Sequence, residues 1–219
     1  MLTAAAVCPQ PPLLVPELAA GAAPELQDVR TACEAAVEAL LPYDVLYVVG
    51  ADTGRHATSF APWGVDVPVD VPEPLPLAVL VGAWLTRGRN RSFVAVDPTL
   101  DADECAALGA ELAASADAVA LLVMGDGSAR HDAKAPGYVD PRAPAFDQDV
   151  RTFFAEGDWD ALRGLDPALA DELLVAGRAP WQVLAGAAAT AAGNATPAVE
   201  PTFTTPYGVG YHVAAWTWR

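Results

Sequence analysis

Three polar loops of this chain carry side chains that are suited to chemistry, and each loop follows an apolar run. The loops span residues 8–12, 50–56 and 125–131. Carboxylates and imidazoles transfer protons and bind metal ions, so the set suits acid–base catalysis or a metal site. The polar residues of interest are Gln10, Asp52, Arg55, His56, Asp126, Ser128, Arg130 and His131.

These loops are expected to meet at one edge of a sheet. Ligands of open α/β sheets bind outside the carboxyl ends of the strands, where each of these loops begins. The sequence therefore predicts one cleft surrounded by Gln10, His56 and His131, although loops collect exposed polar residues in any case. The predicted pocket residues are Gln10, Asp52, His56, Asp126 and Ser128.

Other chemistries match the spacing less well. The loops hold enough donors for zinc, but their spacing is not that of a zinc site. Ser128 and His131 lie three residues apart in "GDGSARH", which lacks the Gly-x-Ser-x-Gly elbow of a serine hydrolase. The segment also lacks the Gly-Lys-Ser/Thr ending of a phosphate-binding loop, so we interpret it as a tight turn.

Longer segments of the chain resemble a known family. They are "AAAVCPQPPLLVPEL" near the N-terminus, "GDGSARH", and "FDQDVRTFFAEGDWDALRGLDPALADELLVAGRAPWQVLAGAA" from residue 146. Together they resemble the family of B-like subunits of the class III extradiol ring-cleavage dioxygenases, most clearly at the two ends and over residues 117–190. The resemblance implies a mixed α/β domain in which two histidines and a glutamate hold Fe(II). It also implies a further histidine that acts as acid and base on a catechol.

The family's functional residues carry over only in part. His131 matches the catalytic acid/base histidine, and His56 is the nearest candidate for the second metal histidine. Gln10 stands where the family has its first metal histidine. The metal glutamate is expected within residues 176–181, which contain no carboxylate; one helical turn earlier, Glu172 is the nearest acid.

The implied Fe(II) site is therefore incomplete, and two hypotheses remain. A neutral amide such as that of Gln10 is a poor ligand for Fe(II), which prefers imidazole and carboxylate, and His56 alone cannot hold iron. The first hypothesis is an oxidoreductase-like enzyme that acts on a small aromatic or other small molecule through His131 and a remodelled metal site. The second is a catalytically silent relative, a pseudoenzyme, that binds a small molecule or a protein partner.

Histidines outside a metal site need partners of their own. We expect His131 to be partly buried and hydrogen-bonded to a carboxylate or a carbonyl, because such a bond orients the ring. Asp126, Asp132 and Asp52 are the carboxylates considered. His212 alternates with apolar neighbours in "VGYHVAAW", which predicts an outward-facing histidine on a strand.

Composition limits the partners and the compartment. The net charge is −16 at pH 7, with Lys134 as the single lysine, so nucleic acid and anionic membranes are not expected as partners. No apolar stretch reaches the length of a membrane-spanning helix. Three widely spaced cysteines, Cys8, Cys33 and Cys105, fit a reducing cytoplasm. An oligomer is left open.

Hydrophobic periodicity predicts one α/β domain over residues 1–219. Its fold class is a mixed, mostly parallel central sheet flanked by helices, with a C-terminal β-hairpin. A long irregular loop over residues 125–144 interrupts the alternation. The expected strands cover residues 2–7, 44–51, 92–97 and 117–125, with two more within 198–218. The expected helices cover residues 24–41, 75–86, 102–115, 145–155, 158–163, 167–176 and 180–192.

Overall fold

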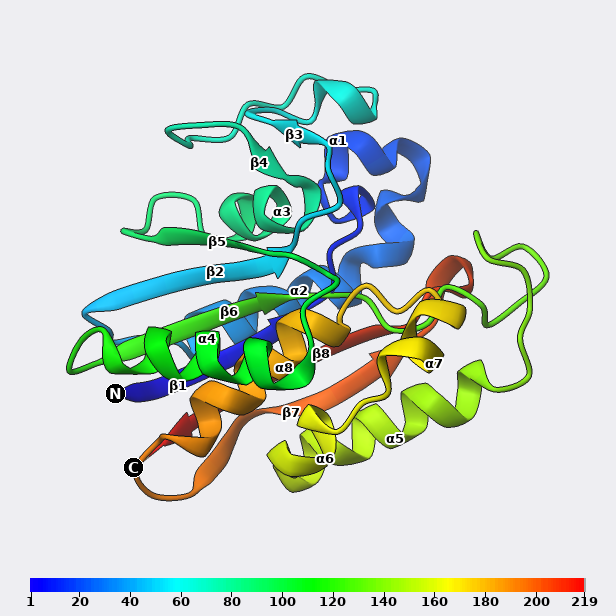
Figure 1. The fold of residues 1–219 in the computed structure, drawn as a ribbon. Coiled ribbons are helices and arrows are strands. Elements are labelled where there is room, and N and C mark those ends of the chain that lie inside the picture. The colour runs from blue at the N-terminus through cyan, green and yellow to red at the C-terminus, as the bar shows by residue number, and fades with distance from the viewer. Residues whose placement is uncertain (219) are drawn as a thin grey trace.

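A computed structural model describes residues 1–218 and shows a six-stranded sheet with helices on both faces (Figure 1). The strand order is β5-β2-β6-β1-β8-β7; the first four strands are parallel, and β8 and β7 are antiparallel to their neighbours. This confirms the predicted mixed, mostly parallel sheet with a C-terminal strand pair. The strands are β1 (Leu2–Cys8), β2 (Val45–Ala51), β5 (Ser92–Val96), β6 (Val119–Met124), β7 (Ala195–Thr204) and β8 (Tyr211–Trp218).

Helices cover the sheet in two layers. Helices α2 and α3 pack on one face, whereas α4, α5, α6 and α8 contribute to the apolar core on the other. The helices are α1 (Pro16–Ala19), α2 (Gln27–Glu38), α3 (Leu77–Leu85), α4 (Ala102–Ala114), α5 (Ala143–Glu156), α6 (Trp159–Arg163), α7 (Pro167–Glu172) and α8 (Arg178–Ala189). No helix within the described residues has the length and apolar character needed to cross a membrane.

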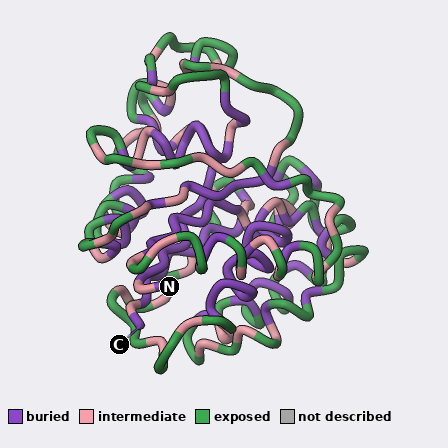
Figure 2. Tube along the Cα trace, turned by 60° about the vertical axis from the view of Figure 1, so that its left-hand side comes forward, coloured by how far each residue is buried: buried purple, intermediate pink, exposed green. Residues whose placement is uncertain are grey.

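The two-layer arrangement follows from strands that are apolar on both faces. Every residue of β6 is buried, and its side chains alternate between the two cores, as a period of two requires. Val119, Leu121 and Val123 enter the core under α4 and α8, whereas the residues between them enter the core under α2 and α3. Figure 2 shows the buried residues running through the interior, with exposed residues along the outer turns.

The sequence marked several boundaries correctly. Asp101 begins α4 with a capping box: its carboxylate accepts from the backbone N–H groups of Asp103 and Glu104, and Glu104 Oε2 accepts from Asp101 N at 3.0 Å. The tryptophans at 181, 216 and 218 are buried in the core. The irregular loop runs from residue 125 to the start of α5.

Other elements were not anticipated. A two-stranded sheet joins β3 (His56–Ala57) to β4 (Leu75–Pro76), so the helix expected from residue 75 begins at Leu77 instead. Pro76 explains this boundary, because it holds the extended backbone conformation observed there and serves as the N-cap of α3. Short helical turns, over Pro12–Leu14, Pro16–Ala19 and Ala20–Leu26, also precede α2, which begins at Gln27.

Candidate functional site

The carboxyl ends of β1 and β6 bring Gln10 and Asp126 together. Cys8 pairs with Met124 in the parallel ladder, and Gly125 N donates to Cys8 O at 3.0 Å just beyond it. One step further, Gln10 N donates to Asp126 Oδ1 at 2.8 Å. Two of the predicted pocket residues are therefore in contact.

Gln10 and Asp126 line a small pocket, here called the Gln10 pocket, of about 270 Å³. Its walls are mostly apolar, and its polar side chains come from Gln10, Asp126 and two tyrosines. The lining residues are Gln10, Pro11, Pro12, Leu13, Leu77, Asp126, Pro136, Tyr207, Val209 and Tyr211. An apolar cavity with a few polar groups is the usual form of a small-molecule site.

The amide of Gln10 is buried without a full set of partners. The residue is only 7% exposed, and its Oε1 has no hydrogen-bond partner within the described part of the chain. Leaving a buried amide oxygen unpaired costs about 1–3 kcal/mol.

Asp126 is held in an environment that disfavours its charge. Burial raises the pKa of its carboxyl group to about 7, although the N–H of Gln10 opposes the shift and the charge of Asp147 adds to it. Burial also raises the pKa of Tyr211, with a further contribution from the charge of Asp126. Near neutral pH, Asp126 therefore exchanges between its neutral and charged forms.

A second cluster surrounds the carboxylate of Asp147 on α5. Asp147 is fully buried and accepts three hydrogen bonds. His131 Nε2 donates to Oδ2 at 2.6 Å, Ser128 N donates to Oδ2 at 3.0 Å, and His212 Nε2 donates to Oδ1 at 2.9 Å. The cluster joins the long loop, α5 and β8 through one carboxylate.

The protonation state of this cluster follows from its geometry. Burial alone would raise the pKa of Asp147, but hydrogen bonds from His131 and His212 outweigh burial and hold the pKa below its ordinary value. Asp147 is therefore ionised at neutral pH and acts only as an acceptor. Both histidines must then carry a proton on Nε2, which leaves Nδ1 as the nitrogen able to exchange a proton when the ring is neutral.

Two glycines make room for the carboxylate. A Cβ atom on Gly127 would lie 2.1 Å from Asp147 Oδ1, and one on Gly210 would lie 2.6 Å from Oδ2. The backbones of these glycines are themselves bonded, with Gly127 N donating to Gly210 O at 2.7 Å. Glycine is needed at both positions because the backbone passes directly against the buried charge.

His212 is not the outward-facing residue that the sequence predicted. It is 1% exposed, because β8 lies between β1 and β7 and both of its faces are covered. The ring of Phe203 stacks on it at 4.7 Å, and Phe154 and Trp181 meet it edge-on, each at 5.7 Å. The alternation in "VGYHVAAW" correctly predicted a strand. His212, however, faces the buried carboxylate of Asp147 instead of solvent.

His131 has the predicted carboxylate partner, but a different one from those considered. Asp147 holds its ring, and the His131 side chain is 8% exposed. Asp132 instead accepts from the backbone of Lys134, and Asp126 turns toward Gln10. Sequence reasoning missed Asp147, although a signal existed.

That signal is the position of Asp147 on its helix. In α5, the buried residues Ala143, Phe146, Val150 and Phe154 recur at three- and four-residue steps, and Asp147 falls on the same stripe. A carboxylate on an apolar stripe is rarely buried without a partner. Such a position therefore indicates a polar residue that is paired inside the fold.

His56 forms a separate, more exposed pair. Its Nε2 lies 2.9 Å from Asp52 Oδ1, and 44% of the His56 side chain is exposed. The backbone N–H of Gly54 and the ring of His56 lower the pKa of Asp52. These two residues lie beyond β2 and on β3, and neither lines the Gln10 pocket.

The predicted residues are thus divided instead of sharing one cleft. Adjacent residues of β8 mark the division, since Tyr211 enters the α2–α3 core and lines the pocket, whereas His212 faces Phe154 and Trp181 of the opposite core. His131 lies on the His212 side, bonded to Asp147. Gln10 lines the pocket with Tyr211, whereas His131 is not among the residues that line it.

The residues present do not fit the Fe(II) that the resemblance implies. Among residues 1–218, no group of three or more His, Cys, Asp or Glu side chains is arranged to hold a metal ion. His56 is bonded to Asp52, away from Gln10, and an amide occupies the position of the first imidazole. Glu172, the alternative acid, pairs with Arg142 at 2.6 Å on the surface.

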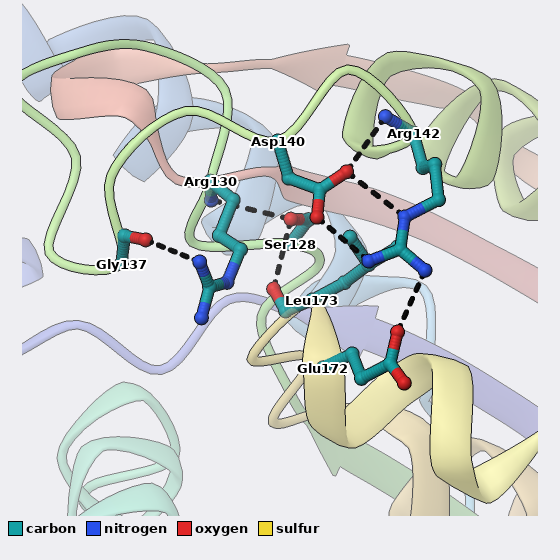
Figure 3. Close-up of polar contacts among 7 residues, drawn as sticks. All are labelled: Ser128, Arg130, Gly137, Asp140, Arg142, Glu172 and Leu173. Carbon is teal, nitrogen blue, oxygen red and sulfur yellow. Dashed lines mark hydrogen bonds and ion pairs between the residues drawn. The ribbon is translucent and has the colours of Figure 1, made fainter.

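Polar contacts hold the long loop against α7, as Figure 3 shows. The buried hydroxyl of Ser128 donates to Leu173 O at 2.9 Å and accepts from Arg130 N at 3.2 Å. At the far end of the loop, Arg142 bonds both Asp140 and Glu172. Ser128 is therefore an anchor of the loop, and its hydroxyl is not poised as a nucleophile.

Comparisons with protein-family models and with curated proteins find no match to this chain. The resemblance to the extradiol dioxygenases stays a prediction from the sequence. The geometry of the Gln10 pocket and of the Asp147 cluster therefore provides the basis for a function.

Proposed function

We propose that this protein binds a small molecule in the Gln10 pocket, as a divergent relative of the B-like extradiol dioxygenase family that no longer cleaves rings. The observation that carries the proposal is an apolar cavity whose wall contains the carboxyl group of Asp126, which accepts one hydrogen bond, from Gln10 N, within the described residues. A mostly apolar cavity with a few polar groups is the usual form of a small-molecule site. The ligand would supply a further hydrogen bond to Asp126.

The size of the cavity limits the ligand. At about 270 Å³, the pocket lies just below the range of drug-sized sites, so it suits a molecule of about one ring with a short polar substituent. Leu77 and Val209 offer apolar contacts, and Asp126 and Gln10 offer polar ones. Small aromatic compounds are the first class to examine.

We propose that the protein does not cleave rings because its residues lack a complete set of ligands for Fe(II). Gln10 contributes a neutral amide, and the two other candidate ligands, His56 and Glu172, are engaged elsewhere. Fe(II) held by a single imidazole is too weakly bound to support the family's reaction. No step through iron is therefore part of the proposed function.

A second candidate function is acid–base catalysis by His131. A buried, ionised carboxylate that holds the Nε2–H of a histidine orients the ring, as in the catalytic triads of hydrolases. The 2.6 Å contact between His131 and Asp147 favours this role. It requires a substrate that reaches the Nδ1 side of His131, outside the Gln10 pocket.

Fragment binding tests the main proposal. A set of single-ring compounds, screened by ligand-observed NMR, should yield binders that Val209→Trp abolishes by filling the pocket. Thr53→Val is the matched control, because Thr53 lines a different cavity at the ends of β2 and β5. Binding that survives Val209→Trp, or no binding by any fragment, would overturn the proposal. Product formation that depends on His131 would favour the second function.

The compartment is also a proposal. All three cysteines are buried and carry free thiols. We propose a cytoplasmic location, where thiols remain reduced. The acidic surface implied by the net charge of −16 supports a protein without nucleic acid partners.

A further inference from the structure

We infer that the ligand of the Gln10 pocket carries an ammonium group, which binds the carboxylate of Asp126 with its apolar body against Tyr211 and Leu77. This inference rests on the proposed function and deepens it by naming the class of ligand. It follows from the hydrogen bonding, charge and shape of the pocket.

Hydrogen-bond acceptors are in excess at the base of the pocket. Within residues 1–218, the one hydrogen bond that Asp126 accepts comes from Gln10 N and reaches Oδ1. Gln10 Oε1 also has no donor among these residues, but surrounding atoms cover it. An ammonium group has three N–H donors and no acceptor, so it can bond the remaining acceptor sites of the Asp126 carboxylate.

The charge of the pocket also favours a cation. No salt bridge within the described residues neutralises Asp126, and the buried charge of Asp147 lies close enough to influence it. The nearby basic side chain of Arg130 is directed to Gly137 O, at 2.6 Å. An anionic ligand would add to the repulsion between the two carboxylates, whereas a cation would relieve it.

Aromatic and apolar groups form the rest of the wall. Tyr207 and Tyr211 both line the cavity, and the faces of such rings attract cations. The hydroxyl of Tyr207 donates to Glu25 Oε2 at 2.8 Å, which places a further negative charge beside the pocket. Leu77 and Val209 complete an apolar surface for the body of the ligand.

The ionisation of Asp126 makes the inference testable by pH. An ammonium ligand binds the charged form of this carboxyl group, whose pKa is raised to about 7. Between about pH 6 and pH 8 the charged fraction rises about tenfold, so the affinity for an amine should rise about tenfold. A neutral ligand of the same shape should show little change, and an anionic one should weaken.

The experiment compares three probes of matched shape on the wild-type protein: 2-phenylethylamine, 2-phenylethanol and phenylacetate. Isothermal titration calorimetry at about pH 8 should show the amine binding at least about tenfold more tightly than the alcohol, with phenylacetate weakest. Asp126→Asn should abolish this preference, and Asp52→Asn, which alters an acid outside the pocket, should retain it.

The outcomes separate the inference from the proposed function. If the alcohol binds in the pocket as tightly as the amine, the inference is overturned and small-molecule binding stands. If neither these probes nor the wider fragment set bind, both fail. Should Asp126→Asn not fold, NMR titration of the wild-type Asp126 carboxyl decides the matter: the amine should lower its pKa, and an unchanged pKa would overturn the inference.

Discussion

The carboxylate of Asp147 lies completely buried, 2.6 Å from Nε2 of His131, and the same carboxylate holds His212 on β8. One charge thus connects α5, the long loop and the sheet. Its three donors compensate for the loss of water around it. The polar interior at this end of the fold depends on that single residue.

The first prediction concerns Asp147→Asn. An amide offers one acceptor oxygen and an NH₂ group, so it cannot accept from both histidines, and its NH₂ would face an N–H donor. We expect a loss of about 3–5 kcal/mol in the free energy of unfolding, measured by urea denaturation. Asp149→Asn on the exposed side of the same helix should change stability by less than about 0.5 kcal/mol. Equal effects of the two substitutions would contradict the role of the cluster.

The second prediction concerns Gly127, whose backbone leaves no room for a side chain beside Asp147. Alanine at Gly127 would place a Cβ atom 2.1 Å from Asp147 Oδ1, so the carboxylate or the backbone must move. We expect Gly127→Ala to destabilise the protein by about 1–3 kcal/mol. Gly21→Ala is the control, because its Cβ would meet nothing within 4 Å. Thermal unfolding of both variants measures the difference, and an unaffected Gly127→Ala would show that the carboxylate is loosely held.

These clusters also show where sequence reasoning ends. The strand expected over residues 44–51 and the helix expected over residues 102–115 depend on neighbours in the chain, so local pattern predicted both. The contact of Asp147 with His212 joins residues 65 positions apart, and local sequence pattern does not predict contacts over such a distance along the chain. His212 was misjudged because alternation gives the period of a strand but not what covers its polar face.

Local sequence pattern also could not predict how the pocket residues would be divided between two sites. Order along the chain placed Gln10, Asp126 and His131 after neighbouring strands, and the contact of Gln10 with Asp126 follows from that order. The direction of each side chain depends on the partner it finds. Asp126 turns to Gln10, and His131 turns to a helix that begins only after the long loop.

The third prediction is a pH dependence of stability that comes from Asp126. Its pKa is raised to about 7 in the folded protein and is ordinary in the unfolded chain, so the folded state binds more protons between about pH 4 and pH 7. This contribution to stability is complete below about pH 4 and is lost as pH rises through 7, by an amount on the order of 4 kcal/mol. Urea denaturation from about pH 4 to pH 8 should show a decline that Asp126→Asn reduces. A profile identical in the variant would contradict the shifted pKa.

Asp147 gives the opposite dependence at lower pH. Its pKa is lowered in the folded state, so its contribution is present above the unfolded pKa, at about 4, and is lost as pH falls through the lower folded value. Acid unfolding of the wild type should therefore steepen below about pH 4. This component should be absent from Asp147→Asn, which separates it from the titration of Asp126.

The last prediction concerns iron. Protein purified without chelator should contain far less than one equivalent of iron, and added Fe(II) should produce no cleavage of catechol, because Gln10 replaces an imidazole and His56 is bonded to Asp52. Gln10→His should not restore binding, since a single new imidazole leaves the site without a second ligand beside it. Elemental analysis and oxygen uptake measure both variants. Stoichiometric Fe(II) in the wild type that is lost in His56→Ala would show that these residues converge in solution, and would return the protein to the ring-cleaving class.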